Sequence, residues 1–371
     1  MKKQIICKTF FGLETILADE LQQFGALNIR KLKRAVACEY NQQLLYTINL
    51  RSRFTLKTLI PILEFTSNDI DNFYKEIYNF NWNNIFNINQ TFTIDFTVQS
   101  PYFKHSKFAS LKMKDAICDY FRKAANARPN IDTENPDIPL HLHIYNERIT
   151  IALDASGKSL HKRGYRQSQH QAPINEVLAA GLIALSNWNK EDTFIDGMCG
   201  SATILCEAAF MAYDIPPNME RNDFAFKHWK DFDDSLFHQT KLYTIKENIP
   251  TKLIGIESDF KNLLLADKNL IAANLQNKVR ITNANFFTYT VPKTKGVCII
   301  NPPYGERMRT KEINELYKKI GDAFKNKYQG YTCGIISSNF EALKYIGLKP
   351  SKKIEVYNGK LPCKFQLYDI Y

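Results

Sequence analysis

The second half of the chain alternates short apolar segments with longer amphipathic ones, and this alternation restricts the fold more than any other feature. The apolar segments, rich in β-branched residues, span 193–196, 252–257, 279–285 and 296–301. Segments of helical period follow the first two, at 203–213 and 259–274. Strands joined in this way by helices form a parallel, doubly wound sheet. We therefore expect an α/β fold for this half.

Polar residues stand where these expected strands end. Ligands of doubly wound sheets bind outside the carboxyl ends of the strands, near the topological switch point. Small residues after Asp196 precede a helix, an arrangement that brings backbone N–H groups close to a ligand. Glu257 suits both ribose hydroxyls of a nucleoside cofactor, and Asn285 suits the edge of an adenine. Together with Gly200 and Asn301, these residues predict a cofactor site at one edge of the sheet.

The strand at 296–300 runs into Asn301-Pro302-Pro303-Tyr304. The two prolines fix φ and remove two backbone donors, so the turn is stiff and rich in acceptors. The side-chain oxygen of Asn301 and the carbonyl of Pro302 suit an exocyclic NH2 group, and the ring of Tyr304 suits the plane that bears it. The loop predicts a site for a planar amine, although an ordinary strand-ending turn remains open on these residues alone.

The end of the chain predicts a helix over 312–325, a strand over 332–338 and an antiparallel pair, 353–357 with 364–370. We expect the connection after Asn358-Gly359 to be longer than a two-residue turn. A helix is also expected to begin at Pro173, because proline is favoured at the first position of a helix.

The first half predicts two smaller mixed units. In the first, a strand at 4–8, a helix at 13–24, a strand into 36–40 and a further apolar run at 44–50 suggest a ferredoxin-like arrangement. In the second, a helix at 67–78, an alternating strand at 91–98, a helix at 108–125 and strands at 140–145 and 148–155 follow in order.

Composition limits the class of protein. The net charge of +11 and the pI near 9.1 favour a polyanionic partner without requiring one. The eight cysteines include no Cys-x-x-Cys pair, so reduced core thiols are expected and a metal site is not. The chain contains neither a signal-peptide pattern nor an apolar run long enough to span a membrane, so a cytoplasmic location is expected.

Five segments together carry a family resemblance, and the order of the second unit resembles a THUMP domain. The segments are His161–Arg166, Ala172–Glu176, Asp196–Thr203, Arg221–Trp229 and Asn301–Arg307. They resemble the THUMP-containing guanine N2-methyltransferases of large-subunit ribosomal RNA, most closely the N-terminal, m2G-forming half of a bacterial fusion enzyme. The resemblance implies a ferredoxin-like domain over 1–55, a THUMP domain over 56–157 and a Rossmann-like class I methyltransferase domain over 158–371.

The same resemblance implies the cofactor, the partner and the site. S-adenosylmethionine is the expected cofactor, and structured RNA, either large-subunit ribosomal RNA or a ribosomal precursor, is the expected partner. The cofactor would be held by Asp196, Met198, Cys199, Gly200, Thr203, Glu257, Asn285 and Asn301. A flipped-out guanine would be held by Asn301, Pro302, Pro303 and Tyr304. The RNA would be contacted by Lys104, His105, Lys107, Lys112, Lys114, Arg163 and Arg166.

Two residues depart from the family pattern. Ala202 replaces the usual glycine, and Asn285 stands where an acid is commoner, although Asn retains an acceptor for the adenine amino group. No covalent nucleophile is required for transfer to an amine, so Cys199 is interpreted as a packing residue. The alternatives are a THUMP enzyme that methylates transfer RNA guanine, a DNA adenine or protein glutamine methyltransferase, and a non-catalytic RNA-binding or ribosome-assembly protein.

Overall fold

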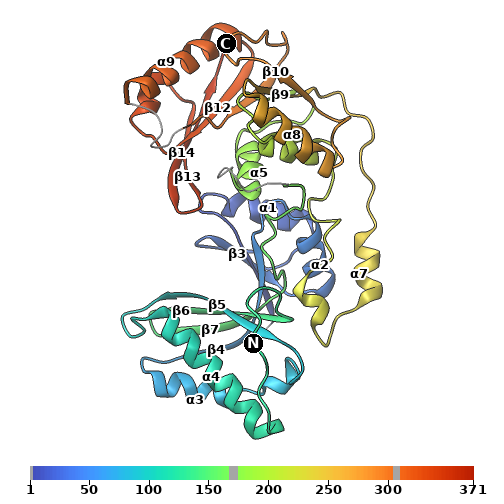
Figure 1. The fold of residues 1–371 in the computed structure, drawn as a ribbon, viewed down its shortest axis with the longest axis vertical. Coiled ribbons are helices and arrows are strands. Elements are labelled where there is room, and N and C mark those ends of the chain that lie inside the picture. The colour runs from blue at the N-terminus through green and yellow to red at the C-terminus, as the bar shows by residue number, and fades with distance from the viewer. Residues whose placement is uncertain (1–2, 167–173, 304–309) are drawn as a thin grey trace.

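The protein contains two seven-stranded sheets that lie in different halves of an elongated molecule (Figure 1). The structure, a computed structural model, describes residues 3–166, 174–303 and 310–371. Within these residues, no helix combines the length and the apolar character needed to cross a bilayer. The expected helix start at Pro173 lies outside the described residues.

The first sheet has the strand order β2-β3-β1-β4-β7-β6-β5, and all neighbours are antiparallel except β5 and β6. Its strands are β1 Gln4–Lys8, β2 Arg30–Leu32, β3 Ala35–Glu39, β4 Lys57–Thr66, β5 Phe92–Gln99, β6 Ile138–Tyr145 and β7 Arg148–Asp154. Its helices are α1 Glu14–Gln23, α2 Gln42–Arg51, α3 Ile70–Asn79 and α4 Ser106–Ala125, with a short 3-10 helix, η1, at Trp82–Asn84. Helices α3 and α4 lie on the side of this sheet that faces away from the second half (Figure 1).

The two predicted units of the first half share this sheet. Strand β4, which the sequence pattern did not reveal, pairs with β1 through Lys57–Leu59 and with β7 through Leu59–Thr66. The apolar run at 44–50 is part of helix α2, capped by the side chain of Asn41. The strand expected to run into 36–40 is the second strand of a β2–β3 hairpin, because Arg34 turns the chain with a φ of 58°.

The second sheet has the order β10-β9-β8-β11-β12-β14-β13, with five parallel strands from β10 to β12. Its strands are β8 Thr193–Asp196, β9 Leu253–Glu257, β10 Arg280–Asn283, β11 Gly296–Ile300, β12 Tyr331–Ser337, β13 Lys352–Asn358 and β14 Leu361–Asp369. Its helices are α5 Glu176–Leu185, α6 Thr203–Ala212, α7 Asp234–Lys241, α8 Phe260–Ala272 and α9 Thr310–Lys327, with 3-10 helices η2 Ala225–His228 and η3 Ala342–Ile346. The predicted doubly wound sheet is confirmed, with its switch point between β8 and β11.

Both faces of this sheet are covered. Residues of α5, α6 and α8 join one apolar cluster that continues into the first half of the chain. Residues of α9 and η3 join a second cluster on the other face. The two halves approach closely where α1 meets α5. A Cβ on Gly181 would lie only 2.5 Å from the side chain of Leu13, which is fully buried. The sheets are therefore linked by a continuous core.

The terminal hairpin is present, but its connection differs from the prediction. Asn358 pairs with Leu361, so only Gly359 and Lys360 form the turn. Strand β14 begins three residues earlier than expected. Its first residues, such as Pro362, pair with β13 alone, because the pairing between β14 and β12 ends before it reaches them. The expectation of a longer connection was wrong.

The segment between α6 and β9 leaves the second sheet and packs on the first half. The ring of Tyr46 in α2 contacts Phe226 and Phe237, with centroid distances of 4.8 and 5.6 Å. The side chain of Gln90 donates to the carbonyl oxygen of His228 over 2.9 Å. This segment, which includes α7, holds both predicted units of the first half against the second (Figure 1).

Candidate active site

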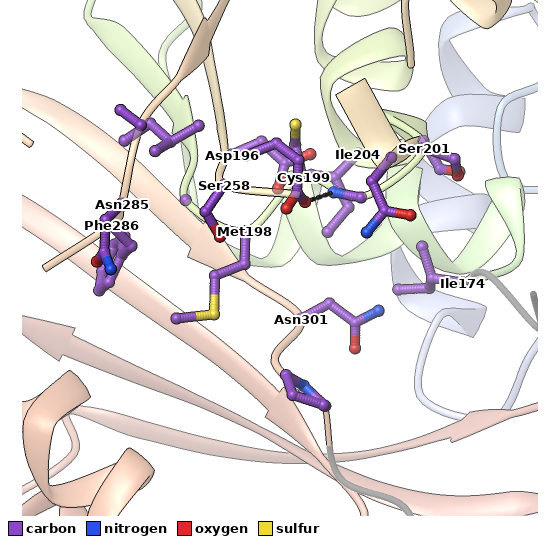
Figure 2. A pocket seen from close by; sticks show the side chains of 18 of the residues that line it. Ile174, Asp196, Met198, Cys199, Ser201, Ile204, Ser258, Asn285, Phe286 and Asn301 are labelled. Atoms are coloured by element: carbon purple, nitrogen blue, oxygen red, sulfur yellow. Dashed lines mark hydrogen bonds between the residues drawn. The ribbon is translucent and has the colours of Figure 1, made fainter. Parts of the chain in front are cut away.

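A cavity of about 480 Å³ opens at the carboxyl ends of β8, β9, β10 and β11. Its lining includes all eight residues predicted to hold the cofactor: Asp196, Met198, Cys199, Gly200, Thr203, Glu257, Asn285 and Asn301. In Figure 2, Asn285 and Phe286 lie at one end of the cavity, Ser201 and Ile174 at the other, and Met198 and Asn301 between them. The parallel sheet brings these residues together because its strands end at one edge.

The turn after β8 forms a cradle for a ligand. Gly200 has a φ of +53°, and a Cβ built on it would meet no atom within 4 Å. A Cβ on Gly197 would instead lie 2.6 Å from Ile300 and 2.7 Å from Phe286. Both positions therefore favour glycine, the first because of its left-handed backbone and the second because of crowding. The backbone at Gly200 is open to a closely bound molecule.

Glu257 ties the end of β9 to this turn. One carboxylate oxygen accepts the N–H of Gly200 over 2.9 Å, and the other accepts the N–H of Asp259 over 2.8 Å. Asp259 in turn caps α8 by accepting the N–H groups of Lys261 and Asn262. The carboxylate is held rigidly at the cavity, and each oxygen retains acceptor capacity for a ligand hydroxyl.

Asp196 is buried beneath the turn. One of its oxygens accepts the N–H of Leu205 over 3.2 Å, whereas the other has no hydrogen-bond partner among the described residues. Burial raises the pKa of this carboxyl to about 8, and the neighbouring Glu257 adds to the rise. A buried acid with an unused acceptor beside a cavity is costly unless a ligand supplies a donor.

The group that Asn285 offers to a ligand is not the one expected from the sequence. Its side-chain oxygen accepts the N–H of Phe287 over 2.8 Å, which fixes the orientation of the amide. The amide NH2 makes no hydrogen bond with another described residue, and Asn285 lines the cavity. We therefore expect Asn285 to donate to a ring nitrogen rather than to serve mainly as an acceptor.

The loop after β11 carries the predicted amine site. The side-chain oxygen of Asn301 is buried and has no partner among the described residues. Pro302 is buried, whereas Pro303 is exposed and lines the cavity. Tyr304, predicted to stack on the amine-bearing ring, lies outside the described residues. Within the described residues, the oxygen of Asn301 is therefore an acceptor without a donor, at the position where a target amine was expected.

Two of the predicted RNA contacts, Arg163 and Arg166, lie beside buried acids within the fold. The side chain of Arg163 is fully buried beside Glu207 and donates to the carbonyl oxygens of Leu160 and Arg53. Arg166 donates to Glu176 over 3.0 Å and to the carbonyl oxygen of Ile174. The prediction that Arg163 contacts phosphate was wrong, because its guanidinium does not reach solvent. Arg166 is committed to a buried acid and supports the wall of the cavity.

The remaining RNA candidates surround the start of α4. Lys104, His105 and Lys107 are exposed, and Tyr102 and Phe108 beside them are 52% and 50% exposed. Lys112 and Lys114 are half-buried along the helix, Lys112 near the rings of Tyr74 and Phe108 and Lys114 near Asp115. The structure thus presents the first three to solvent among aromatic rings, and their role stays a prediction.

Several cavity residues were missed by the sequence interpretation. They are Ile174, Ser201, Ile204, Ser258, Asn262, Phe286, Phe287 and Leu316. Phe286 and Phe287 directly follow Asn285, so an aromatic pair after a strand-ending amide was an available signal for a stacked ring. Nothing in the sequence marked Leu316 as a cavity residue, because it lies far along the chain from most of the other residues that line the cavity. Where the chain is described, no group of three or more His, Cys, Asp or Glu residues is placed to bind a metal ion.

The fold and the cavity together define a class I methyltransferase. The doubly wound sheet ends in an antiparallel hairpin, and an acid closes β9 at a cavity lined by small residues. The cofactor of this class, S-adenosylmethionine, fits the donor and acceptor set. The backbone at Gly200 leaves space for such a ligand, and the side-chain oxygens of Asp196 and Asn301 that lack a partner among the described residues favour a polar one.

The chain belongs to the family described as "RMKL-like, methyltransferase domain", which it matches over residues 163–366. It also matches a THUMP domain over residues 67–154 and an RlmL ferredoxin-like domain over residues 4–59. The predicted family and fold class are therefore confirmed. The exact domain limits, 55 and 157, stay predictions.

Relatives and solved structures agree with this family. The chain is 35% identical over 364 residues to a Synechocystis protein named "Putative RNA methyltransferase slr0064", covering 97% of this chain and 95% of that protein. It is 34% identical over 368 residues to "Ribosomal RNA large subunit methyltransferase K/L" of Shewanella oneidensis. The match covers 97% of this chain and 52% of that protein, so this chain spans about half of its length. The structure titled "Crystal structure of SMU.472, a putative methyltransferase complexed with SAH" superimposes with a TM-score of 0.89 at 25% identity, covering 100% of this chain and 99% of that one.

Proposed function

We propose that the protein methylates the exocyclic N2 amine of a guanine in large-subunit ribosomal RNA, with S-adenosylmethionine as methyl donor. The observation that carries the proposal is the buried side-chain oxygen of Asn301 at the edge of the cavity, which has no hydrogen-bond partner among the described residues. The ribosomal RNA named for the Shewanella relative supports the choice of RNA, and the match to a THUMP domain supports an RNA partner in general. The expected site of action is the cytoplasm.

The contribution of the chain to this reaction is orientation. S-adenosylmethionine supplies an electrophilic methyl group when it is bound. The side-chain oxygen of Asn301 accepts one N–H of the amine, with the carbonyl of Pro302 as the second predicted acceptor. These two bonds direct the nitrogen lone pair towards the cavity, and they strengthen as positive charge develops on nitrogen. The proton leaves the nitrogen after transfer.

The cavity disfavours a mechanism that needs a cysteine nucleophile. Cys199 lines the cavity but is buried, and burial raises the pKa of its thiol well above the usual value. A neutral, buried thiol is a poor nucleophile, whereas attack on a pyrimidine ring requires a thiolate. This property favours transfer to an amine over methylation at pyrimidine C5.

Nucleoside analysis tests the proposal. Ribosomal and transfer RNA from cells that lack this protein are incubated with the purified protein and S-adenosylmethionine, digested, and analysed by mass spectrometry. We expect new N2-methylguanosine in large-subunit ribosomal RNA. The same product in transfer RNA alone would overturn the choice of RNA, and methylation of adenine or of protein would overturn the choice of amine. If calorimetry detected no cofactor binding at millimolar concentration, the protein would not be an enzyme of this kind.

A further inference from the structure

The β13–β14 hairpin extends past the edge of the sheet at which the cavity opens. Ser337, the last residue of β12, pairs with Lys364, whereas β14 begins at Leu361. The tip of the hairpin therefore projects beyond the carboxyl ends of the parallel strands. It lies on the β11–β12 side of the sheet, opposite the side where β9 and β10 contribute to the cavity.

The strand register places this tip close to the amine site. Ile300 pairs with Ile335, so Asn301 follows level with Ile336, one residue before the Ser337–Lys364 pair. Neighbouring strands are about 4.8 Å apart, which separates the backbones of Asn301 and Lys364 by roughly 10 Å. A strand of RNA with one nucleotide at Asn301 would meet the hairpin with its neighbouring nucleotides.

The hairpin carries an excess of positive charge, although Glu355 is the cross-strand partner of Lys364. Between Lys349 and Lys364 the sequence contains five lysines and one acid, Glu355. None of these lysines forms an ion pair with a described residue, and Lys352, Lys353 and Lys360 are exposed. Lysines in excess on a protruding hairpin complement a phosphate backbone.

An aromatic ring stands beside the lysines at the same edge. Phe340 follows β12, is 39% exposed, and lies under the ammonium group of Lys364 at 4.6 Å from the ring centroid. A partly exposed phenyl ring with a cation on one face is a suitable stacking surface for an unpaired base.

The hairpin is also anchored to the first half of the chain. Tyr357 contacts Phe11 edge-on with a centroid distance of 5.9 Å. A Cβ on Gly12 would approach the carbonyl oxygen of Glu355 to 2.8 Å, so the two backbones lie in close contact. Figure 1 shows the hairpin reaching from the second sheet to the level of α1. A surface fixed at both ends can hold an RNA strand in a defined position.

We propose that this surface, formed by Lys360, Lys364 and Phe340, binds the single RNA strand adjacent to the target nucleotide. The lysines contact its phosphates, and a neighbouring base stacks on Phe340. This inference rests on the proposed function, because it requires RNA as the substrate. It adds a second RNA contact at the catalytic edge, distinct from the exposed residues at the start of α4, which belong to the far side of the first sheet (Figure 1).

Salt dependence of RNA binding tests the inference. Affinity for a fluorescein-labelled single-stranded oligoribonucleotide is measured by anisotropy over a range of salt concentrations. Replacing both Lys360 and Lys364 by alanine should reduce the slope of log affinity against log salt by about 1.4, since each phosphate contact on a single strand contributes about 0.7. Lys360→Ala alone should reduce it by about half as much. Phe340→Ala should weaken binding about tenfold and leave the slope unchanged.

The matched control removes two lysines elsewhere on the second half. Lys252 precedes β9 at the opposite edge of the sheet, and Lys268 lies exposed on α8. The double alanine variant of this pair should keep the wild-type slope, and every variant should retain affinity for S-adenosylhomocysteine.

The outcomes separate the two proposals. If the wild type methylates ribosomal RNA but the hairpin and control variants share one slope, the inference is wrong and the proposed function stands. If the wild type neither binds nor methylates RNA, the proposed function fails and the inference fails with it.

Discussion

Two asparagines with buried side-chain oxygens, one in each half of the chain, show how differently the two halves use polar groups. Asn49 in α2 donates to Leu45 and Thr58 and accepts from Thr58 and Ser156. Its amide therefore has a partner for both its oxygen and its nitrogen. The oxygen of Asn301 is also buried but has no partner among the described residues. The same residue type is satisfied in one region and unsatisfied in the other.

The difference follows from the architecture of each half. In the first half, the hydrogen bonds around Asn49 join α2, β4 and the turn after β7, so each polar group has a protein partner in place of water. In the second half, the parallel strands collect polar ends at one edge, where a cavity separates them. A satisfied polar cluster stabilises the fold, whereas an unsatisfied one provides binding capacity at a cost in stability.

The largest expected effect separates catalysis from stability at Asn301. Asn301→Ala should lower the single-turnover rate of methyl transfer about 10³-fold, because it removes a preorganised acceptor for the charged nitrogen. The free energy of unfolding should not fall, and should rise by up to about 1 kcal/mol, since the buried oxygen has no described partner to lose and its burial is costly. Rapid-quench kinetics and urea unfolding measure the two quantities. A rate within tenfold of the wild type would contradict the mechanism.

The matched substitution in the first half should show the reverse pattern. Asn49→Ala leaves the hydroxyls of Thr58 and Ser156 buried with fewer partners, so we expect a loss of about 3 kcal/mol in the free energy of unfolding. The affinity of the folded protein for S-adenosylhomocysteine, measured by calorimetry, should remain within about twofold of the wild type. Comparable losses of stability in both alanine variants would break the distinction.

A smaller effect is expected from Asp196, and it depends on pH. Burial raises its pKa to about 8, whereas an unfolded Asp titrates near 3.9. Between these values the folded state retains a proton that the unfolded state has released, so stability falls as pH rises from about 4 to about 8. Asp196→Asn should remove this loss, so the ligand-free variant should gain stability relative to the wild type as pH rises from about 4 to about 8.

Urea unfolding of both proteins at several pH values checks this result. The same variant should bind S-adenosylhomocysteine more weakly, because the unpaired carboxylate oxygen at the cavity is lost. A variant that loses stability relative to the wild type as pH rises would show that the charge of Asp196 stabilises the ligand-free fold.

The predictability of the molecule also differs between its two halves. In the second half, the fold could be predicted from local sequence, because each strand and the helix that covers it are adjacent in sequence. The polar residues that end the strands also lie at the same edge of the sheet. In the first half, β4 was missed because the run from Lys57 to Thr66 mixes buried and exposed residues without regular alternation. Its role depends on partners far along the chain, namely β1 and β7.

The candidate site shows the same limit. Residue type and order predicted which side chains line the cavity, from Asp196 to Asn301. They could not predict that Arg163 is buried, because its partners Glu207 and Arg53 are distant in sequence. Nor could they predict that Asn285 directs its oxygen to the N–H of Phe287, since that depends on the local turn.

The smallest expected effect concerns Ala202, the residue that replaces the usual glycine. It caps the start of α6 with a φ of 63°, is fully buried, and is not among the residues that line the cavity. A left-handed alanine is strained by about 1 kcal/mol or slightly more, and the greater flexibility of an unfolded glycine offsets about half of that. Ala202→Gly should therefore raise the free energy of unfolding by about 0.5 kcal/mol.

The affinity for S-adenosylhomocysteine should stay within twofold in this variant, because the turn keeps its shape and no contact to the cavity changes. Paired unfolding and calorimetry experiments measure both quantities. A gain in affinity of tenfold or more would show that the methyl group of Ala202 alters the turn at Gly200. The departure from the family pattern would then affect ligand binding, as Asn301 does, and not the stability of the fold, as Asn49 does.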